Sequence, residues 1–156
     1  MEIERKWLIR KEQIPYDLEK LPSHAIEQCY VSFSPVIRIR KINHGERYIL
    51  TVKSTEQGIS RQEFELPLSR EEYENLYQKH EGNVLQKTRY LKEENGLVQE
   101  IDIFQGELAG LCYMEIEFPT KEAAETYPTP DWVVADVSDR IEYANASLAR
   151  HGRPTT

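Results

Sequence analysis

Charged side chains at alternate positions run through most of the extended segments expected in this chain, and this pattern constrains the fold more than any other feature. Extended segments are expected at residues 2–9, 26–33, 36–42, 47–54, 60–67, 85–93, 97–104 and 111–118. Residues two apart point to the same side of a strand. In all but the segment 26–33, one side therefore carries charges and the other mainly apolar residues. Short turns at Asn43–Gly45 and Glu94–Gly96 favour an antiparallel meander.

These charges are also sorted by sign along the chain. The plainest interpretation is the solvated face of a sheet, where a cross-strand ion pair contributes about 0.2–1 kcal/mol. Such a face usually mixes signs within a strand, whereas several segments here carry one sign only, and same-sign neighbours repel. The sorting therefore favours a bound ligand or ion. The basic pairs are Arg38 with Arg40 and Lys87 with Arg89, and the acidic pairs are Glu100 with Asp102 and Glu115 with Glu117.

A sheet of eight strands with one apolar face would expose its edges unless it curled and closed. Closure with the aliphatic face outward, under the helices, places the charges in the lumen. We therefore expect a mainly β (α+β) fold. It is a closed eight-stranded antiparallel barrel, or tunnel, with a charged lumen and a few helices outside and at the C-terminus. At 156 residues the chain is expected to form a single domain, 1–156.

The expected lumen charges suggest what the tunnel holds. Eight acids and seven bases sum to −1, and two divalent cations would bring that sum to +3, which a multiply charged triphosphate anion offsets. Carboxylates without histidine or cysteine favour Mg²⁺ or Mn²⁺ over zinc, and Mg²⁺ commonly bridges to substrate phosphates. The acids are Glu2, Glu4, Glu63, Glu65, Glu100, Asp102, Glu115 and Glu117, and the bases are Lys6, Arg38, Arg40, Lys53, Arg61, Lys87 and Arg89.

Composition excludes several classes of function. A formal net charge of −7 argues against nucleic acid as a partner. No apolar run is long enough to span a membrane, and the acidic start of the chain does not fit a signal peptide. We therefore expect a soluble cytoplasmic protein with no membrane partner. Cys29 and Cys112 have no metal-type spacing and are expected to be reduced structural thiols.

Three helices are expected. Ser69 and Glu72 form a capping box, followed by an apolar stripe at helical spacing. A short helix is expected at residues 121–126, stopped by Pro128. A third is expected from about residue 138 to 150, with Ile141 and Leu148 on one side.

The ordered set of charged motifs resembles the CYTH domain family, the triphosphate tunnel metalloenzymes, over residues 2–145. The resemblance implies a closed barrel whose tunnel binds triphosphates with Mg²⁺ or Mn²⁺, and a C-terminal helix that plugs or lines one mouth. Glu142 stands where many members have a basic residue before the tyrosine. The matching positions are Glu2, Glu4 and Lys6; Arg38 and Arg40; Thr51 and Lys53; Arg61, Glu63 and Glu65; Lys87 and Arg89; Glu100 and Asp102; Gly110, Leu111, Glu115 and Glu117; and Val137, Ser138, Tyr143 and Asn145.

The resemblance, closest to the short bacterial tripolyphosphatases, implies metal-dependent hydrolysis of the terminal phosphoanhydride of inorganic triphosphate, with nucleoside triphosphates as further substrates. One metal would bridge the phosphates, and a second would acidify the attacking water. Catalysis is assigned to Glu2, Glu4, Lys6 and Glu117. The expected phosphate-binding groups are Lys6, Arg38, Arg40, Lys53, Arg61, Lys87, Arg89 and Arg140. The expected ligands of two metal ions are Glu2, Glu4, Glu65, Asp102, Glu115 and Glu117.

Three other functions stay open at this point. A class IV-type adenylate cyclase would form cyclic AMP and pyrophosphate. A non-catalytic polyphosphate- or nucleotide-binding module would keep the basic clamp without productive metals. A thiamine triphosphatase would need an aromatic mouth, for which the candidates are Tyr30, Tyr48, Tyr90 and Tyr113.

The oligomeric state is also open. An apolar outer face under three short helices leaves room for a homodimer.

Overall fold

The computed structural model describes residues 3–53 and 63–154. Its strands are β1 (Glu4–Leu8), β2 (Ser23–Phe33), β3 (Val36–Ile42), β4 (Arg47–Lys53), β5 (Glu63–Pro67), β6 (Glu81–Glu94), β7 (Leu97–Gln105), β8 (Cys112–Glu117) and β9 (Ala135–Asp136). The α-helices are α1 (Arg70–Tyr77), α2 (Lys121–Thr126) and α3 (Asn145–His151). Short 3-10 turns are η1 (Lys11–Gln13), η2 (Leu18–Lys20), η3 (Gly106–Leu108) and η4 (Ile141–Tyr143).

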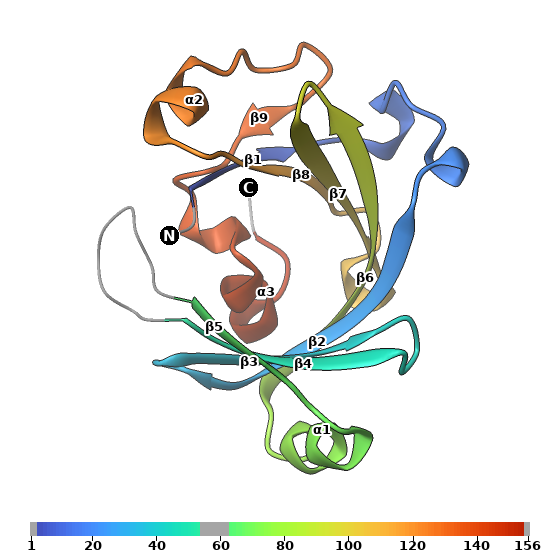
Figure 1. The fold of residues 1–156 in the computed structure, drawn as a ribbon, viewed down its shortest axis with the longest axis vertical. Coiled ribbons are helices and arrows are strands. Elements are labelled where there is room, and N and C mark those ends of the chain that lie inside the picture. Colours follow the sequence, from blue (N-terminus) through green and yellow to red (C-terminus); the bar gives the residue numbers. More distant parts are fainter. Residues whose placement is uncertain (1–2, 54–62, 155–156) are drawn as a thin grey trace.

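The nine strands form one sheet that curls into a ring around α3 (Figure 1). Their order is β5-β4-β3-β2-β6-β7-β8-β1-β9, and every ladder is antiparallel. The predicted mainly β, antiparallel architecture with three helices is confirmed, and eight of the strands match the expected segments closely. The ninth, β9, was not expected. In the described residues the ladders run in one row from β5 to β9, and no ladder joins these two edge strands.

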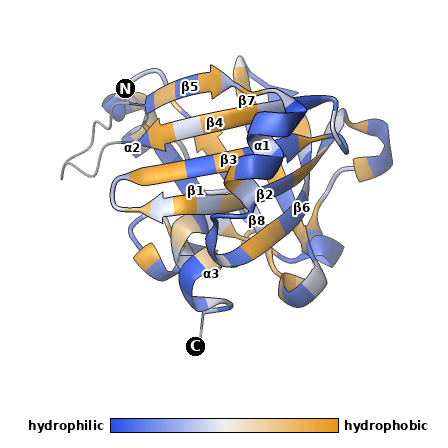
Figure 2. Ribbon diagram, turned by 90° about the horizontal axis from the view of Figure 1, so that it is seen from below, coloured by the Kyte–Doolittle hydropathy of each residue, from blue (hydrophilic) through white to orange (hydrophobic). Residues whose placement is uncertain are grey.

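The outer face of the ring is apolar, as the alternation predicted, and helices cover it. Hydrophobic and hydrophilic residues alternate along β3 and β5 (Figure 2). One outer cluster, around Cys29, Ile39 and Tyr73, lies beneath α1, and a second, around Trp7 and Met114, lies beneath α2. Both helices therefore cover the outer surface of the sheet, and the charged residues face the inside of the ring.

The inside of the ring is divided between an apolar half and a charged half. The apolar half is filled by α3, whose Leu148 and Ala149 are fully buried against Tyr30, Leu85 and other inward residues of the wall. Figure 1 shows α3 in the middle of the ring, so this helix closes part of the bore. The charged residues of the wall border the space that α3 leaves.

The expected helix over residues 138–150 is wrong in its first half. Residues 141–143 form only a 3-10 turn, and α3 begins at Asn145, after Ala144 in an extended conformation (φ −68°, ψ 147°). Ile141 is 77% exposed, whereas Leu148 is fully buried, so the two do not share a face. The cause is tertiary: the preceding residues hydrogen-bond to β1, with the Val137 amide donating to the Lys6 carbonyl at 2.9 Å, and the chain must then turn into the ring.

Local signals elsewhere in the sequence are confirmed. Ser69 and Glu72 form both hydrogen bonds of the capping box that begins α1. Asn43 and Asn95 adopt positive φ values of 49° and 53° in tight hairpin turns. Cys29 and Cys112 are free, buried thiols, and burial raises the pKa of Cys29 to about 12. Among the described residues, no helix has the length and apolar character needed to cross a bilayer.

Leu148→Ala should lower the free energy of unfolding by about 2–5 kcal/mol, because it opens a cavity in the apolar half of the ring. Ile141→Ala is the matched control, since this side chain is largely exposed, and it should change stability by less than about 0.5 kcal/mol. Urea denaturation followed by circular dichroism measures both. Equal effects of the two substitutions would contradict the placement of α3.

Candidate active site

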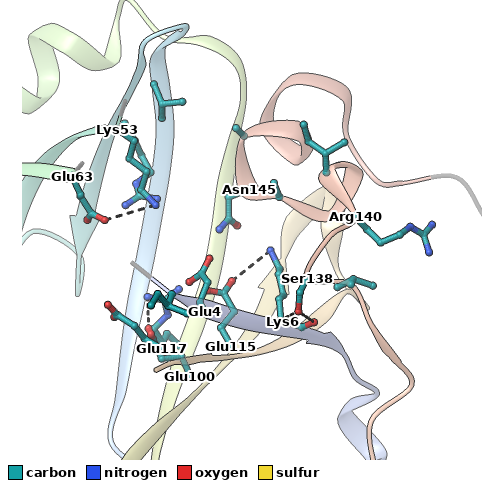
Figure 3. A pocket seen from close by; sticks show the side chains of 18 of the residues that line it. Glu4, Lys6, Lys53, Glu63, Glu100, Glu115, Glu117, Ser138, Arg140 and Asn145 are labelled. Carbon is teal, nitrogen blue, oxygen red and sulfur yellow. Dashed lines mark hydrogen bonds and ion pairs between the residues drawn. The ribbon is translucent and has the colours of Figure 1, made fainter. Parts of the chain in front are cut away.

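A cavity of about 1050 Å³ lies inside the charged half of the ring. Its wall is built from β1–β8, the segment that leads into α3 and the first residues of α3 (Figure 3). The charged residues of the wall are Glu4, Lys6, Arg38, Arg40, Lys53, Glu63, Glu65, Arg89, Glu100, Glu115 and Glu117, and Asp139 and Arg140 belong to the C-terminal segment. The structure therefore brings together most of the residues that the sequence singled out.

Carboxylates gather on three neighbouring strands, β7, β8 and β1. In the ladders Glu4 lies directly opposite Glu117, and Glu100 lies directly opposite Glu115. Like charges that face each other across two strands destabilise a sheet. Burial first, and then Glu115 and Asp102, raise the pKa of Glu100 in spite of the opposing effect of Arg89. The acidic wall therefore holds negative charge that a cation would neutralise.

The basic wall lies on β3, where Arg38 and Arg40 face the cavity. The Nε atoms of both side chains are buried and have no hydrogen-bond partner, and among the described residues no carboxylate forms an ion pair with either guanidinium. Burial, followed by repulsion from Arg38 and Arg89, lowers the pKa of Arg40 to about 9. Two guanidinium groups held this way favour an anion that can accept hydrogen bonds from both.

Lys6 stands between the acidic wall and the C-terminal segment. Its Nζ donates to the Tyr143 carbonyl at 2.7 Å, lies 3.5 Å from a Glu115 carboxylate oxygen and sits 4.2 Å from the centre of the Tyr113 ring. Burial alone would raise the pKa of Glu115, but Lys6, Arg89 and Lys87 together outweigh it, and the pKa is lowered. The ammonium is thus fixed at the cavity wall with its direction set by a backbone carbonyl.

Two predicted site residues, Lys87 and Asp102, lie behind the cavity wall rather than on it. Their side chains are fully buried and form an ion pair at 2.8 Å. Arg89 adds two hydrogen bonds to Asp102, at 2.8 and 2.9 Å, and an ion pair with Glu100 at 2.6 Å. Burial lowers the pKa of Lys87 to about 7. Although burial would raise the pKa of Asp102, Lys87 and Arg89 lower it. Their expected roles in phosphate and metal binding stay predictions.

The remaining predicted residues are more scattered. Lys53 pairs with Glu63 at 3.9 Å on the side of the cavity opposite the acidic wall (Figure 3). Glu65 follows on β5 and is exposed. Arg140 pairs with Glu142, and its side chain points away from the cavity (Figure 3). Glu2 and Arg61, which were assigned to metal and substrate binding, lie outside the described residues.

Several residues in or next to the wall were given no catalytic, phosphate-binding or metal-binding role from the sequence. The Ser138 hydroxyl accepts a hydrogen bond from the Lys6 amide at 2.9 Å, and the Asn145 carboxamide lies 3.5 Å from Lys87 Nζ. Tyr30 lines the cavity, and Gln28 is fully buried with both side-chain polar atoms unpartnered. The two β2 residues lie in the one expected strand without alternating charges, so charge periodicity could not mark them. Ser138 and Asn145 matched family positions that carried no assigned role.

Among the described residues, no group of three or more carboxylate, imidazole or thiol side chains is already arranged around a metal position. The donor set nonetheless fits Mg²⁺ or Mn²⁺, because the pairs Glu4 with Glu117 and Glu100 with Glu115 supply oxygen atoms only. Mg²⁺ is usually held by one or two carboxylates together with water and substrate phosphates. These two pairs are therefore sufficient for such a site.

Comparisons with known proteins agree with the geometry. The model of the CYTH domain family matches residues 1–151. An inorganic triphosphatase from Nitrosomonas europaea is 34% identical over 150 residues, which are 95% of this chain and 96% of that protein. One from Acetivibrio thermocellus is 35% identical over 126 residues, or 80% of this chain and 79% of that protein. A crystal structure of an inorganic triphosphatase matches with a TM-score of 0.70 at 31% identity, covering 96% of this chain and 94% of the other.

Asp102→Asn should lower the free energy of unfolding by about 3–5 kcal/mol in metal-free buffer, because it leaves the fully buried Lys87 without its ion pair and Arg89 with Glu100 alone. A carboxylate that served only to bind metal would give the opposite sign, since its removal would relieve repulsion in the absence of the ion. Asp131→Asn, in an exposed loop, is the control and should have little effect. Thermal and urea denaturation with a chelator present distinguish the two outcomes.

Proposed function

The chain belongs to the CYTH domain family, and from this premise we propose that it hydrolyses the terminal phosphoanhydride of inorganic triphosphate, with nucleoside triphosphates as further substrates. The names of the two curated relatives support this activity. The observation that carries the proposal is the pair Arg38 and Arg40. Arg38 is buried and Arg40 is half-buried, and the Nε atom of each is buried without a hydrogen-bond partner. Neither has a carboxylate partner among the described residues, and both face a carboxylate wall inside one cavity.

In the proposed complex the basic wall binds the phosphate oxygens. Arg38 and Arg40 present planar forks that suit bidentate contacts, and Arg89 and Lys53 extend this wall on β6 and β4. Lys6 approaches from β1 with its ammonium already directed by the Tyr143 carbonyl. Charge on the transferring phosphoryl group is therefore offset from several sides, and the groups that offset it are held in place before substrate arrives.

We propose that the acidic wall binds two Mg²⁺ or Mn²⁺ ions together with the phosphates. Glu115 and Glu117 would hold one ion, and Glu4 with Glu2 or Glu65 the other. Glu100 lines the cavity and Asp102 does not, so Glu100 is the better candidate on β7. A bound divalent ion would neutralise phosphate charge and make a bound water more acidic. The cross-strand like-charge pairs support this assignment.

The chemistry of the wall favours hydrolysis over the alternatives. Of the tyrosines considered for a thiamine-binding mouth, Tyr48 and Tyr90 pack in the outer clusters and only Tyr30 lines the cavity. A phosphate-binding module without catalysis would have no need of the paired carboxylates. The adenylate cyclase alternative is tested by measuring its product, cyclic AMP.

Two further properties belong to the same proposal. We place the protein in the cytoplasm, and we propose a homodimer that covers part of the apolar outer face. On β5 the outward side chains Phe64 and Leu66 are 60% and 44% exposed, which supports a partner on this side. Analytical ultracentrifugation measures the oligomeric state directly.

Phosphate release from inorganic triphosphate should require Mg²⁺ or Mn²⁺ and should stop when a chelator is added, because the acidic wall then lacks its counter-ions. One assay plate compares inorganic triphosphate, ATP, thiamine triphosphate and pyrophosphate, each with Mg²⁺, Mn²⁺ or chelator. Orthophosphate from inorganic triphosphate supports the proposal. Cyclic AMP from ATP, or turnover that persists in chelator, would contradict it.

Glu117→Gln should reduce metal-dependent turnover about 100-fold or more, the effect of losing one electrostatic group at a developing charge. Glu4→Gln should behave similarly, and both variants should keep the wild-type circular dichroism spectrum. Glu93→Gln, at an exposed position of β6, is the matched control and should retain full turnover. If the two cavity variants kept near-normal rates, the metal assignment would be wrong.

A further inference from the structure

A series of hydrogen bonds links the outside of the barrel to the Lys6 ammonium inside it. It runs through residues 134–143, which we call the C-terminal strap. The strap lies along β1: the Val134 amide donates to the Leu8 carbonyl at 2.8 Å and the Val137 amide to the Lys6 carbonyl at 2.9 Å. Its last carbonyl, that of Tyr143, accepts the hydrogen bond from Lys6 Nζ. The strap therefore contacts both the backbone and the ammonium of Lys6.

Arg5 secures the outer side of this strap. It lies on β1 between two cavity residues but points the other way, and its guanidinium donates four hydrogen bonds. They go to the carbonyls of Ala124 and Tyr127 at 3.1 and 2.6 Å, and to the Thr129 hydroxyl and the Asp136 carboxylate, each at 2.9 Å. The ring of Trp7 lies 4.7 Å from the guanidinium carbon. A lysine at this position could not form the same planar set of contacts.

Asp136 links Arg5, on the outer side of the strap, to Ser138, on the cavity side. While one carboxylate oxygen accepts from Arg5, the other accepts from the Ser138 amide at 2.9 Å and from the Ser138 hydroxyl at 2.6 Å. A hydroxyl that donates its single proton to Asp136 is left as the acceptor for the Lys6 amide. Burial would raise the pKa of Asp136, but the hydrogen bonds from Ser138 and Arg5 lower it, so the carboxylate stays ionised.

We propose that Arg5 and Asp136 are positioning residues for the triphosphate site, acting through the C-terminal strap to fix the Lys6 ammonium. Neither side chain lines the cavity, whereas Ser138 and Lys6 do (Figure 3). Without both oxygens of the Asp136 carboxylate, either the acceptor for Arg5 or the acceptor for Ser138 is lost, and the strap loses its link to the barrel wall. The Tyr143 carbonyl then no longer holds a fixed position over Lys6. The kinetic consequence rests on the proposed function, but the effect on Lys6 itself does not.

The first test needs no substrate. Reductive methylation of the lysines, read by mass spectrometry, should label Lys6 several-fold faster in Asp136→Asn than in the wild type. Lys87, which is fully buried, should keep its slow rate, and Lys121, which is exposed, its fast rate. Faster labelling of Lys6 and Lys87 together would indicate general loosening of the barrel, and unchanged labelling of Lys6 would show that the strap does not hold it. Either result would overturn the proposal.

The second test is a double-mutant cycle on kcat/KM for inorganic triphosphate. Asp136→Asn should cost about tenfold in the wild-type background, the size of one charge-assisted hydrogen bond. In a Lys6→Met background it should cost less than about twofold, because the group that it positions is already absent. If the losses in kcat/KM from Asp136→Asn and Lys6→Met simply multiplied in the double variant, the proposal would be overturned. A wild type that releases no phosphate would instead contradict the proposed function, while the labelling result would stand.

Control variants separate this effect from a general loss of stability. Asp131→Asn makes the same chemical change in an exposed part of the same connection and should leave both readouts unchanged. If Asp136→Asn does not fold, Arg5→Lys provides the second variant, since it keeps the positive charge but cannot form the four-bond set. It should also accelerate Lys6 labelling selectively, and wild-type labelling in this variant would contradict the proposal.

Discussion

The structure depends on the cost of keeping charges inside a barrel. A charge that leaves water must be paired or bind an ion, and this barrel directs a row of charges inward from most of its strands. The charges are distributed by strand, so that an acidic wall on β7, β8 and β1 and a basic wall on β3 border one cavity. Behind the cavity wall, Lys87 and Asp102 form a buried ion pair that Arg89 joins from the cavity side. At the cavity surface, Arg38 and Arg40 have no carboxylate partner among the described residues, which suits an anionic ligand.

An inward charged face reverses the usual arrangement of a small barrel, and the rest of the fold follows from this. The apolar residues must be covered from outside, which is what α1 and α2 do for the clusters around Tyr73 and Trp7. The part of the bore that holds no charge must be filled with apolar groups, and α3 supplies Leu148 and Ala149. Each helix is thus placed by a surface of the sheet rather than by its own helical propensity.

The sequence predicted the strands and the inward charges because both depend on local rules. Alternation with period two, the turn residues Asn43 and Asn95, and the capping box at Ser69 act within a few residues of each other. How deep a side chain lies within the barrel depends on contacts between distant parts of the chain. Arg89 and Lys87 alternate in the same way, yet Arg89 lines the cavity and Lys87 lies behind it, next to α3. Periodicity assigns a residue to a face but gives no position along the bore.

The C-terminal part was the hardest to predict for the same reason. Residues 138–143 were expected to begin a helix but are extended or in a 3-10 turn, because the chain before them is bonded to β1, more than a hundred positions earlier. Because β1 pairs with β8 and β9, the cavity is completed only when both ends of the chain are in place, and pairings of this length form slowly. The β1–β8 ladder places Glu4 opposite Glu117, and on the same strand the strap brings the Tyr143 carbonyl to Lys6. The contacts that join the two ends of the chain therefore also orient the lysine.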